Sequence, residues 1–206
     1  TYATAIDNIE GGGGGTGDCT LESITITENG KYYPNEGIDG YNEVIVNVTT
    51  PTDVYKVTDG VKFKTSTFTT IPEGLDFSNV TDFTQTFMDC ANLKSVNINT
   101  SNAIKFESTF ENCTNLTGII LGDSFEEIED KAFSACCNLT NIIFGNNLET
   151  IGNEAFAICN KLTSVVIGNN IETIGASAFV SCNNLTSVVL GDSVEMIGGC
   201  AFAYNS

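Results

Sequence analysis

A seven-residue pattern, F-x-x-C-x-x-L, recurs along this chain at a fixed interval and constrains its fold more than any other feature. Five copies are present, and each phenylalanine lies 23 residues after the one before it. The copies are Phe87/Cys90/Leu93, Phe110/Cys113/Leu116, Phe133/Cys136/Leu139, Phe156/Cys159/Leu162 and Phe179/Cys182/Leu185, and Phe202 keeps the spacing. A period of roughly 20 to 29 residues with apolar residues at constant offsets is typical of a solenoid, because neighbouring coils bury one another's apolar faces. The pattern therefore predicts a right-handed solenoid of 23-residue coils over residues 75–206, with an incomplete last coil.

The apolar positions divide each predicted coil into two kinds of segment. Offsets +3 and +5 from the motif leucine are apolar in every copy, as in Val96 and Ile98. This alternation predicts a strand with these side chains inward and offsets +2 and +4 outward. The motif itself spaces apolar residues three apart, which favours a helical or 3₁₀ turn. We therefore predict the fold class as an α/β solenoid.

Residues 21–50 show the two-residue period of strands instead of the repeat. Two strand-like segments, residues 24–27 and 43–48, lie on either side of Asn29-Gly30, a dipeptide typical of hairpin turns. We predict a small all-β module here.

Two further segments precede the repeats. Residues 1–20 include a run of five glycines, which predicts a flexible linker. Residues 51–74 are expected to form a β-hairpin, with Asp59-Gly60 at its turn. Its place before the first repeat predicts a cap over the apolar end of the solenoid.

The charge balance excludes several classes of function. The chain has 26 acidic and 8 basic residues, a formal net charge of −18, and no His. Such a surface repels nucleic acid and anionic membrane. No apolar run approaches the roughly 18 residues of a membrane span, so no membrane insertion is expected. Every basic residue is Lys, and nothing singles out a catalytic pair among the carboxylates. We therefore predict neither an enzyme nor a cofactor.

The eight cysteines favour packing over chemistry. Five of them lie on the repeat period and form one column, whereas Cys19, Cys137 and Cys200 lie off it. We predict that the column consists of buried thiols acting as small apolar side chains, with a disulfide or a redox role as the alternatives. The absence of CxxC and of His argues against a metal site. The three cysteines outside the column are the better candidates for exposed or paired thiols.

The later repeats resemble a known family. Residues 151–165 (IGNEAFAICNKLTSV) and 174–188 (IGASAFVSCNNLTSV) are similar to the BspA-like (Treponema-type) leucine-rich repeat, with its pattern I-G-x-x-A-F-x-x-C-x-x-L-T-S-I. The resemblance covers residues 119–202 closely. The first two coils depart from it with F-x-x-x-F, and resemble the related S-N-V-T-x-M-x-x-M-F surface-protein repeat. The resemblance implies bacterial surface proteins that bind host or microbial partners; related repeats also occur in phage proteins.

The outward strand positions are the candidate binding residues, because they form an uncharged stripe on a strongly acidic chain. These positions are Ser95, Asn97, Ile120, Asn141, Ile143, Ser164, Val166, Ser187 and Val189. An exposed apolar stripe tends to mark an interaction site. The alternative is that Val and Ile merely favour strands and that a neighbouring module packs there. A separate acidic column, Glu126, Glu149, Glu172 and Glu195, is expected to be a solvated edge.

These observations predict a non-catalytic binding or adhesion module of a bacterial cell-surface or secreted protein. It would recognise a protein or glycan, on a host or neighbouring cell, through the concave sheet face, and its location would be extracellular. The alternative is a structural or receptor-binding component of a phage particle, associated with the tail. The incomplete last coil also suggests end-to-end self-association through its exposed strand edge.

Overall fold

A computed structural model of the chain describes residues 21–25, 44–47, 55–57, 59–63, 69–71, 75–98, 100 and 102–205. These residues contain short β-strands and turns, and no helix. The strands are β1 (Leu21–Thr25), β2 (Val44–Asn47), β3 (Tyr55–Lys56), β4 (Leu75–Asp76), β5 (Gly118–Ile120), β6 (Glu127–Ile128), β7 (Asn141–Ile143), β8 (Thr150–Ile151), β9 (Ser164–Val166), β10 (Thr173–Ile174), β11 (Ser187–Val189) and β12 (Met196–Ile197). No helix long and apolar enough to cross a bilayer occurs in this part of the chain.

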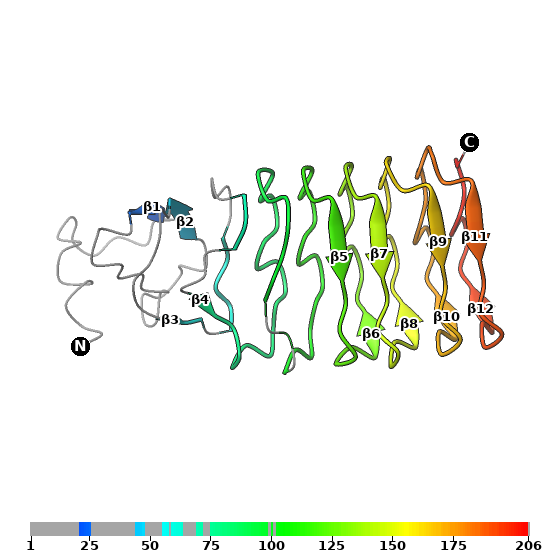
Figure 1. Ribbon diagram of the computed structural model, residues 1–206, viewed down its shortest axis with the longest axis horizontal. Helices are drawn as coiled ribbons and strands as arrows, with labels where there is room; N and C mark the ends of the chain where they lie inside the picture. Colours follow the sequence, from blue (N-terminus) through cyan, green and yellow to red (C-terminus); the bar gives the residue numbers. More distant parts are fainter. Residues whose placement is uncertain are drawn as a thin grey trace.

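The repeats form the predicted solenoid, with coils that follow one another along its long axis (Figure 1). Strand pairing between coils is parallel, and partners lie 23 residues apart, as in the pair Gly118↔Asn141. The short strands β6, β8, β10 and β12 form one four-stranded sheet. In the earlier coils the described pairing consists of β3 with β4 and the isolated parallel bridges Thr70↔Ser95 and Asp82↔Lys105.

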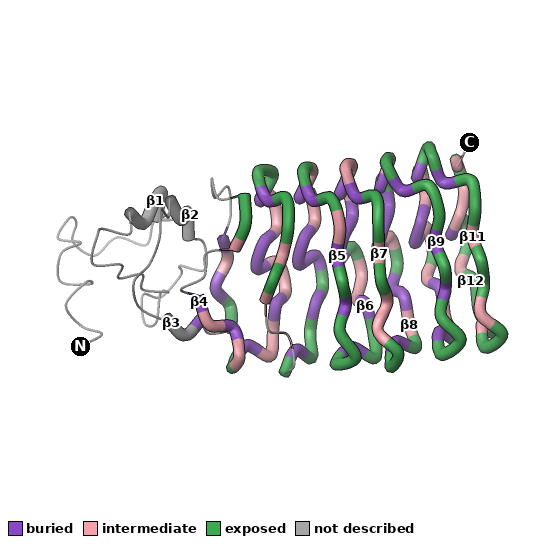
Figure 2. Tube along the Cα trace, viewed as in Figure 1, coloured by how far each residue is buried: buried purple, intermediate pink, exposed green. Residues whose placement is uncertain are grey.

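A column of phenylalanine rings runs through the centre of the solenoid. Successive rings from Phe63 to Phe202 stack with centroids 5.1–5.5 Å apart and interplanar angles of 3–11°. This distance is close to the separation of adjacent strands, about 4.7–4.9 Å, because one ring is contributed by each coil. Figure 2 shows the buried residues lining the inside of successive coils. The repeated phenylalanine is therefore the central packing residue of the fold.

The helical part of the predicted fold class is wrong: F-x-x-C-x-x-L forms turns. The residues two before and two after each phenylalanine have φ between 50° and 62°, which is incompatible with an α-helix. The amides also bond to the next coil, as in Phe87 N to Thr109 O, 2.9 Å, and Asp89 N to Glu111 O, 2.8 Å. Because these amides bond between coils, they are not available for bonds to the carbonyl four residues back, and the chain forms tight turns instead of a helix.

The N-terminal strands differ from the predicted hairpins. β1 and β2 lie within residues 21–50 as expected, but they are parallel and so are not the two arms of one hairpin; Asn29-Gly30 lies outside the described residues. In residues 51–74, β3 pairs in parallel with β4, which follows the segment, and not with a second strand inside it. Phe63 is buried and stacks on Phe87 at 5.3 Å. The described part of this segment thus continues the coil packing, and its role as a cap stays a prediction. The predicted linker, residues 1–20, lies outside the described residues.

Candidate binding face

The strands β5, β7, β9 and β11 present one row of apolar side chains to solvent. The residues of this row have exposed fractions of 75% (Ile120), 48% (Ile143), 67% (Val166) and 54% (Val189). Inward neighbours such as Ile119 are buried. The polar candidates are also exposed: Ser95, Asn97, Asn141, Ser164 and Ser187. We call the nine candidate residues together the strand face.

The strand face is interrupted, which the sequence pattern does not predict. β5 pairs with β7 and β9 pairs with β11, but these are two separate two-stranded sheets. The interruption coincides with a change in an asparagine column: Asn115 and Asn138 donate to carbonyls of the preceding coil at 2.7 and 2.8 Å, whereas Lys161 occupies the next equivalent position. The neighbouring Asn160 Oδ1 is buried without a hydrogen-bond partner. The coil contact is therefore altered just before β9.

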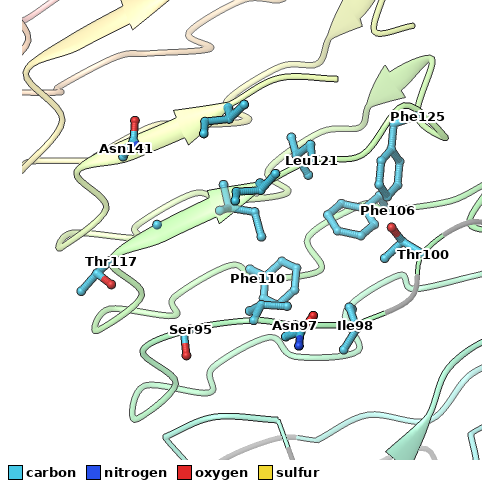
Figure 3. A pocket seen from close by; sticks show the side chains of 15 residues that line it. Ser95, Asn97, Ile98, Thr100, Phe106, Phe110, Thr117, Leu121, Phe125 and Asn141 are labelled. Carbon is cyan, nitrogen blue, oxygen red and sulfur yellow. The ribbon is translucent and has the colours of Figure 1, made fainter. Parts of the chain in front are cut away.

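A first groove opens on the N-terminal side of β5, between this strand and residues 95–98. Its volume is about 660 Å³. Figure 3 shows Phe106 and Phe125 at one end of it, Phe110 near its middle, and Ser95 and Thr117 toward the other end. The phenylalanine rings are buried, so they form the apolar floor. No charged residue lines the groove. We call it the β5 groove.

A second groove lies at the interruption between β7 and β9. Its volume is about 470 Å³, and Phe144 and Val166 contribute its apolar walls. Asn146, Asn169 and Asn170 supply neutral polar groups. The candidate face therefore combines an apolar row with two uncharged grooves, an arrangement suited to noncovalent binding. The alternation of inward and outward positions along the predicted strands was enough to identify the apolar row. The grooves were missed because they depend on where strand pairing fails.

The acidic column is separate from the strand face. Glu126, Glu149, Glu172 and Glu195 are all exposed, as expected for a solvated edge. Their backbones form a ladder in which Glu149 N donates to Glu126 O at 2.8 Å. Among the described residues, no group of His, Cys, Asp or Glu is arranged to hold a metal ion.

The cysteine column is buried, as predicted. Cys90, Cys113, Cys136, Cys159 and Cys182 are inaccessible to solvent. Each thiol donates to the carbonyl of a phenylalanine in the preceding coil, as in Cys113 Sγ to Phe87 O, 3.1 Å. Burial, with a smaller contribution from neighbouring thiols, raises the pKa of Cys113 well above its ordinary value. The neutral thiol is a poor nucleophile.

The cysteines outside the column differ from one another in exposure. Cys137 is half-buried and Cys200 is exposed, and both are free thiols. Cys19 lies outside the described residues.

Comparison with known proteins identifies the repeats. Residues 83–206, more than half of the chain, match the model of the BspA type leucine-rich repeat region in six copies. No curated protein sequence matches the chain significantly.

Solved structures support the same fold. A leucine-rich repeat protein from Bacteroides ovatus matches with a TM-score of 0.61 and 23% identity, over 89% of this chain and 46% of that one. A leucine-rich cell surface protein from Faecalibacterium prausnitzii matches with a TM-score of 0.51 and 20% identity, over 89% of this chain and 57% of that one. The chain thus spans about half the length of these two structures. The protein belongs to the BspA-type leucine-rich repeat family.

Proposed function

We propose that this protein is a non-catalytic binding or adhesion module, displayed on or secreted from a bacterial cell, that recognises a protein or glycan through the strand face. The observation that carries the proposal is the exposed apolar row Ile120, Ile143, Val166 and Val189. Leaving such a row in water is unfavourable, since each fully buried Val or Ile side chain stabilises by roughly 1.5–3 kcal/mol. A partner that covers the row would recover part of this free energy.

The charge distribution supports the same surface. The chain has a formal net charge of −18, yet the nine strand-face residues include no charged side chain. Charged residues are depleted at the centres of protein interfaces because burying them unpaired is costly. The acidic residues lie elsewhere, as in the glutamate column. This separation supports a contact in which a partner excludes water from the strand face while the charged residues stay solvated outside the contact.

The family supports the proposed location. The Faecalibacterium prausnitzii protein with a similar fold is described as a leucine-rich cell surface protein. At 20% identity this likeness shows a common fold alone, so the surface location is part of the proposal.

The test uses an immobilised chain probed with arrays of secreted proteins and of glycans. The double variant Ile143→Asp/Val166→Asp should lose retention of any ligand that the wild type holds, because two carboxylates would be placed in the contact. Both side chains are largely exposed, so the fold should tolerate the change. Circular dichroism and thermal unfolding verify that the double variant is folded.

A matched control adds the same charge elsewhere. Ile104 and Tyr204 are each 79% exposed and belong neither to the strand face nor to the lining of either groove, so Ile104→Asp/Tyr204→Asp should retain the ligand. Equal loss in both double variants would show a general charge effect and contradict the proposal. Retention by the Ile143→Asp/Val166→Asp variant would favour the alternative in which the face packs against a neighbouring module.

A further inference from the structure

The β5 groove exists because two neighbouring coils fail to pair along it. On one side of β5 the ladder is intact, with Leu121 N donating to Ile143 O at 2.9 Å. On the other side Thr117 N donates to Lys94 O at 3.1 Å. Beyond that bond, no backbone hydrogen bond joins residues 96–98 to β5, although both segments are described. Neighbouring amides of a strand point to opposite sides, and the Leu121 amide bonds to β7, so the adjacent Ile120 amide is directed toward the groove.

One residue of the groove lining has no side chain. Gly118 occupies offset +2, where the other four coils have Ser95, Asn141, Ser164 and Ser187. A Cβ at Gly118 would lie 3.7 Å from Asn141 O, an ordinary contact distance. The glycine is therefore not required by a clash with the neighbouring coil, and a larger residue could be placed in the groove lining at this position.

The lining determines what the groove can hold. Its polar groups are neutral hydroxyls and amides, including Ser95, Asn97 and Thr100, and its floor consists of apolar side chains. A charged ligand group buried here would have no counter-charge, which is strongly unfavourable. The volume of about 660 Å³ is within the range of roughly 300–1,000 Å³ that holds specific ligands. The ligand segment is therefore uncharged.

We infer that the β5 groove binds an extended, uncharged peptide segment of a protein partner by adding its backbone to β5. Main-chain bonding with alternate side chains in apolar pockets is the recognition mode that a strand with an unpaired edge supports. The hydroxyls of a glycan would find no polar partners on the apolar floor, which is formed by buried phenylalanine rings. The formal charge of −18 favours a segment with Lys or Arg at its ends, outside the groove. This inference rests on the proposed binding function and specifies its ligand.

The probe is a fluorescein-labelled peptide, Lys-Lys-Thr-Val-Thr-Val-Thr-Val-Thr-Lys-Lys, titrated with the full chain by fluorescence polarisation. A second peptide of the same sequence carries N-methyl groups on alternate central amides. Because N-methylation removes backbone donors and blocks strand addition, its dissociation constant should be at least tenfold weaker. Equal dissociation constants for the two peptides would mean that the protein does not hydrogen-bond to the peptide backbone, and this would overturn the inference.

Two glycine variants locate the site. Gly118→Leu fills the groove wall and should weaken binding of the probe at least tenfold. Gly122→Leu is the matched control: it is in the same coil, outside the groove lining, and a Cβ there meets nothing within 4 Å. It should bind the probe as the wild type does. Thermal unfolding of both variants verifies that the coils remain folded.

The remaining outcomes separate this inference from the proposed function. A ligand from the arrays could fail to bind Ile143→Asp/Val166→Asp and still bind Gly118→Leu normally. The strand face would then function without the groove, so this inference would be overturned while the proposed function would stand. A wild type that fails to bind the probe, or that binds a neutral oligosaccharide in competition with it, also overturns the inference. Loss of the probe in Gly118→Leu alone supports it.

Discussion

Two residues in each coil from Phe87 to Phe202 have φ between 50° and 62°, and none of them is glycine. The position two after the phenylalanine has this conformation in Asp89, Asn112, Ala135, Ile158, Ser181 and Tyr204. Asn and Asp tolerate it better than other non-glycine residues, because their short polar side chains bond locally. Ile158 is the one β-branched residue among the six, with φ of 61° and 43% of its surface exposed. It carries conformational strain with little compensating burial.

Replacing Ile158 should therefore stabilise the protein. Ile158→Asn introduces the residue that already occupies the equivalent Asn112 position, and should raise the free energy of unfolding by about 1 kcal/mol. Urea denaturation measures the change. Ile158→Val keeps the branched Cβ and should give no gain. A less stable Ile158→Asn would mean that packing of the isoleucine outweighs the strain.

A second prediction at the scale of residues concerns the loss of stability at low pH. Asp59 accepts hydrogen bonds from Thr81 N at 2.7 Å, Thr81 Oγ1 at 2.7 Å and Asp82 N at 3.0 Å. Partial burial raises its pKa, but bonds from Asp82 and Thr81 and the charge of Lys105 outweigh this, so the pKa lies below its ordinary value. The folded state stabilises the ionised carboxylate more than the unfolded state does. The stability that Asp59 contributes is therefore present above the unfolded pKa of about 3.9, and it is lost as pH falls through the folded pKa.

The measurement is urea unfolding of wild type and Asp59→Ala across this pH range. At pH 7 the substitution should cost about 1 kcal/mol, a value kept small because the carboxylate is mostly exposed. The difference should shrink as pH falls below about 4. A difference that stays constant with pH would show that ionisation of Asp59 does not contribute.

At the scale of elements, close approach of coils explains the glycine that follows each of the short strands β8, β10 and β12. Gly152, Gly175 and Gly198 donate to the preceding coil at 2.7 Å. A Cβ on any of them would lie 2.4–2.8 Å from backbone atoms of that coil. In earlier coils the equivalent residues are Phe83, Phe106 and Glu129. The first two coils, which have phenylalanine here, and the last three, which have glycine, therefore differ at this coil edge, and the coil of Glu129 lies between them.

The prediction at this scale is a pair of alanine substitutions. Gly175→Ala should lower the free energy of unfolding by about 3 kcal/mol or more, because its Cβ would meet the Gly152 carbonyl carbon at 2.6 Å and the strand would have to shift. Gly168→Ala, with nothing within 4 Å of the added Cβ, should change stability by less than about 0.5 kcal/mol. Thermal unfolding distinguishes them, and equal effects would contradict the close-approach explanation.

At the scale of the whole molecule, stability depends on contacts between neighbouring coils. A solenoid coil contacts only the coils beside it, so its energetics approximate a sum of repeat and nearest-neighbour contributions. The phenylalanine column makes this measurable, since Phe133 and Phe156 stack at 5.1 Å whereas Phe87 and Phe179 lie four coils apart.

Double-mutant cycles test this organisation. Phe133→Leu and Phe156→Leu together should depart from additivity by about 0.5–1.5 kcal/mol, because their rings are in contact. Phe87→Leu and Phe179→Leu together should be additive within about 0.5 kcal/mol. Urea unfolding of the single and double variants provides the values. Coupling of the distant pair as strong as that of the neighbouring pair would show that the solenoid responds as one rigid core.

The repeat spacing allowed much of this architecture to be predicted. The 23-residue period identified the coils, the buried cysteine column and the outward row from Ile120 to Val189, because stacking places equivalent residues above one another. Apolar residues three apart could not distinguish a helix from a turn, because both bury one side of the chain. That choice depended on hydrogen bonds to the next coil, such as Phe87 N to Thr109 O, which local sequence does not specify.

The chain's sequence by itself determined the solenoid, its period, and which side chains face solvent. Only the tertiary structure decided where neighbouring coils pair and where they separate. Pairing depends on the fit between two coils, as in the open contact beside Gly118 and the interrupted asparagine column at Lys161. A periodic pattern describes each coil separately and carries no information about that fit. The grooves of the candidate face arise from these contacts, so they became visible only when the coils were stacked.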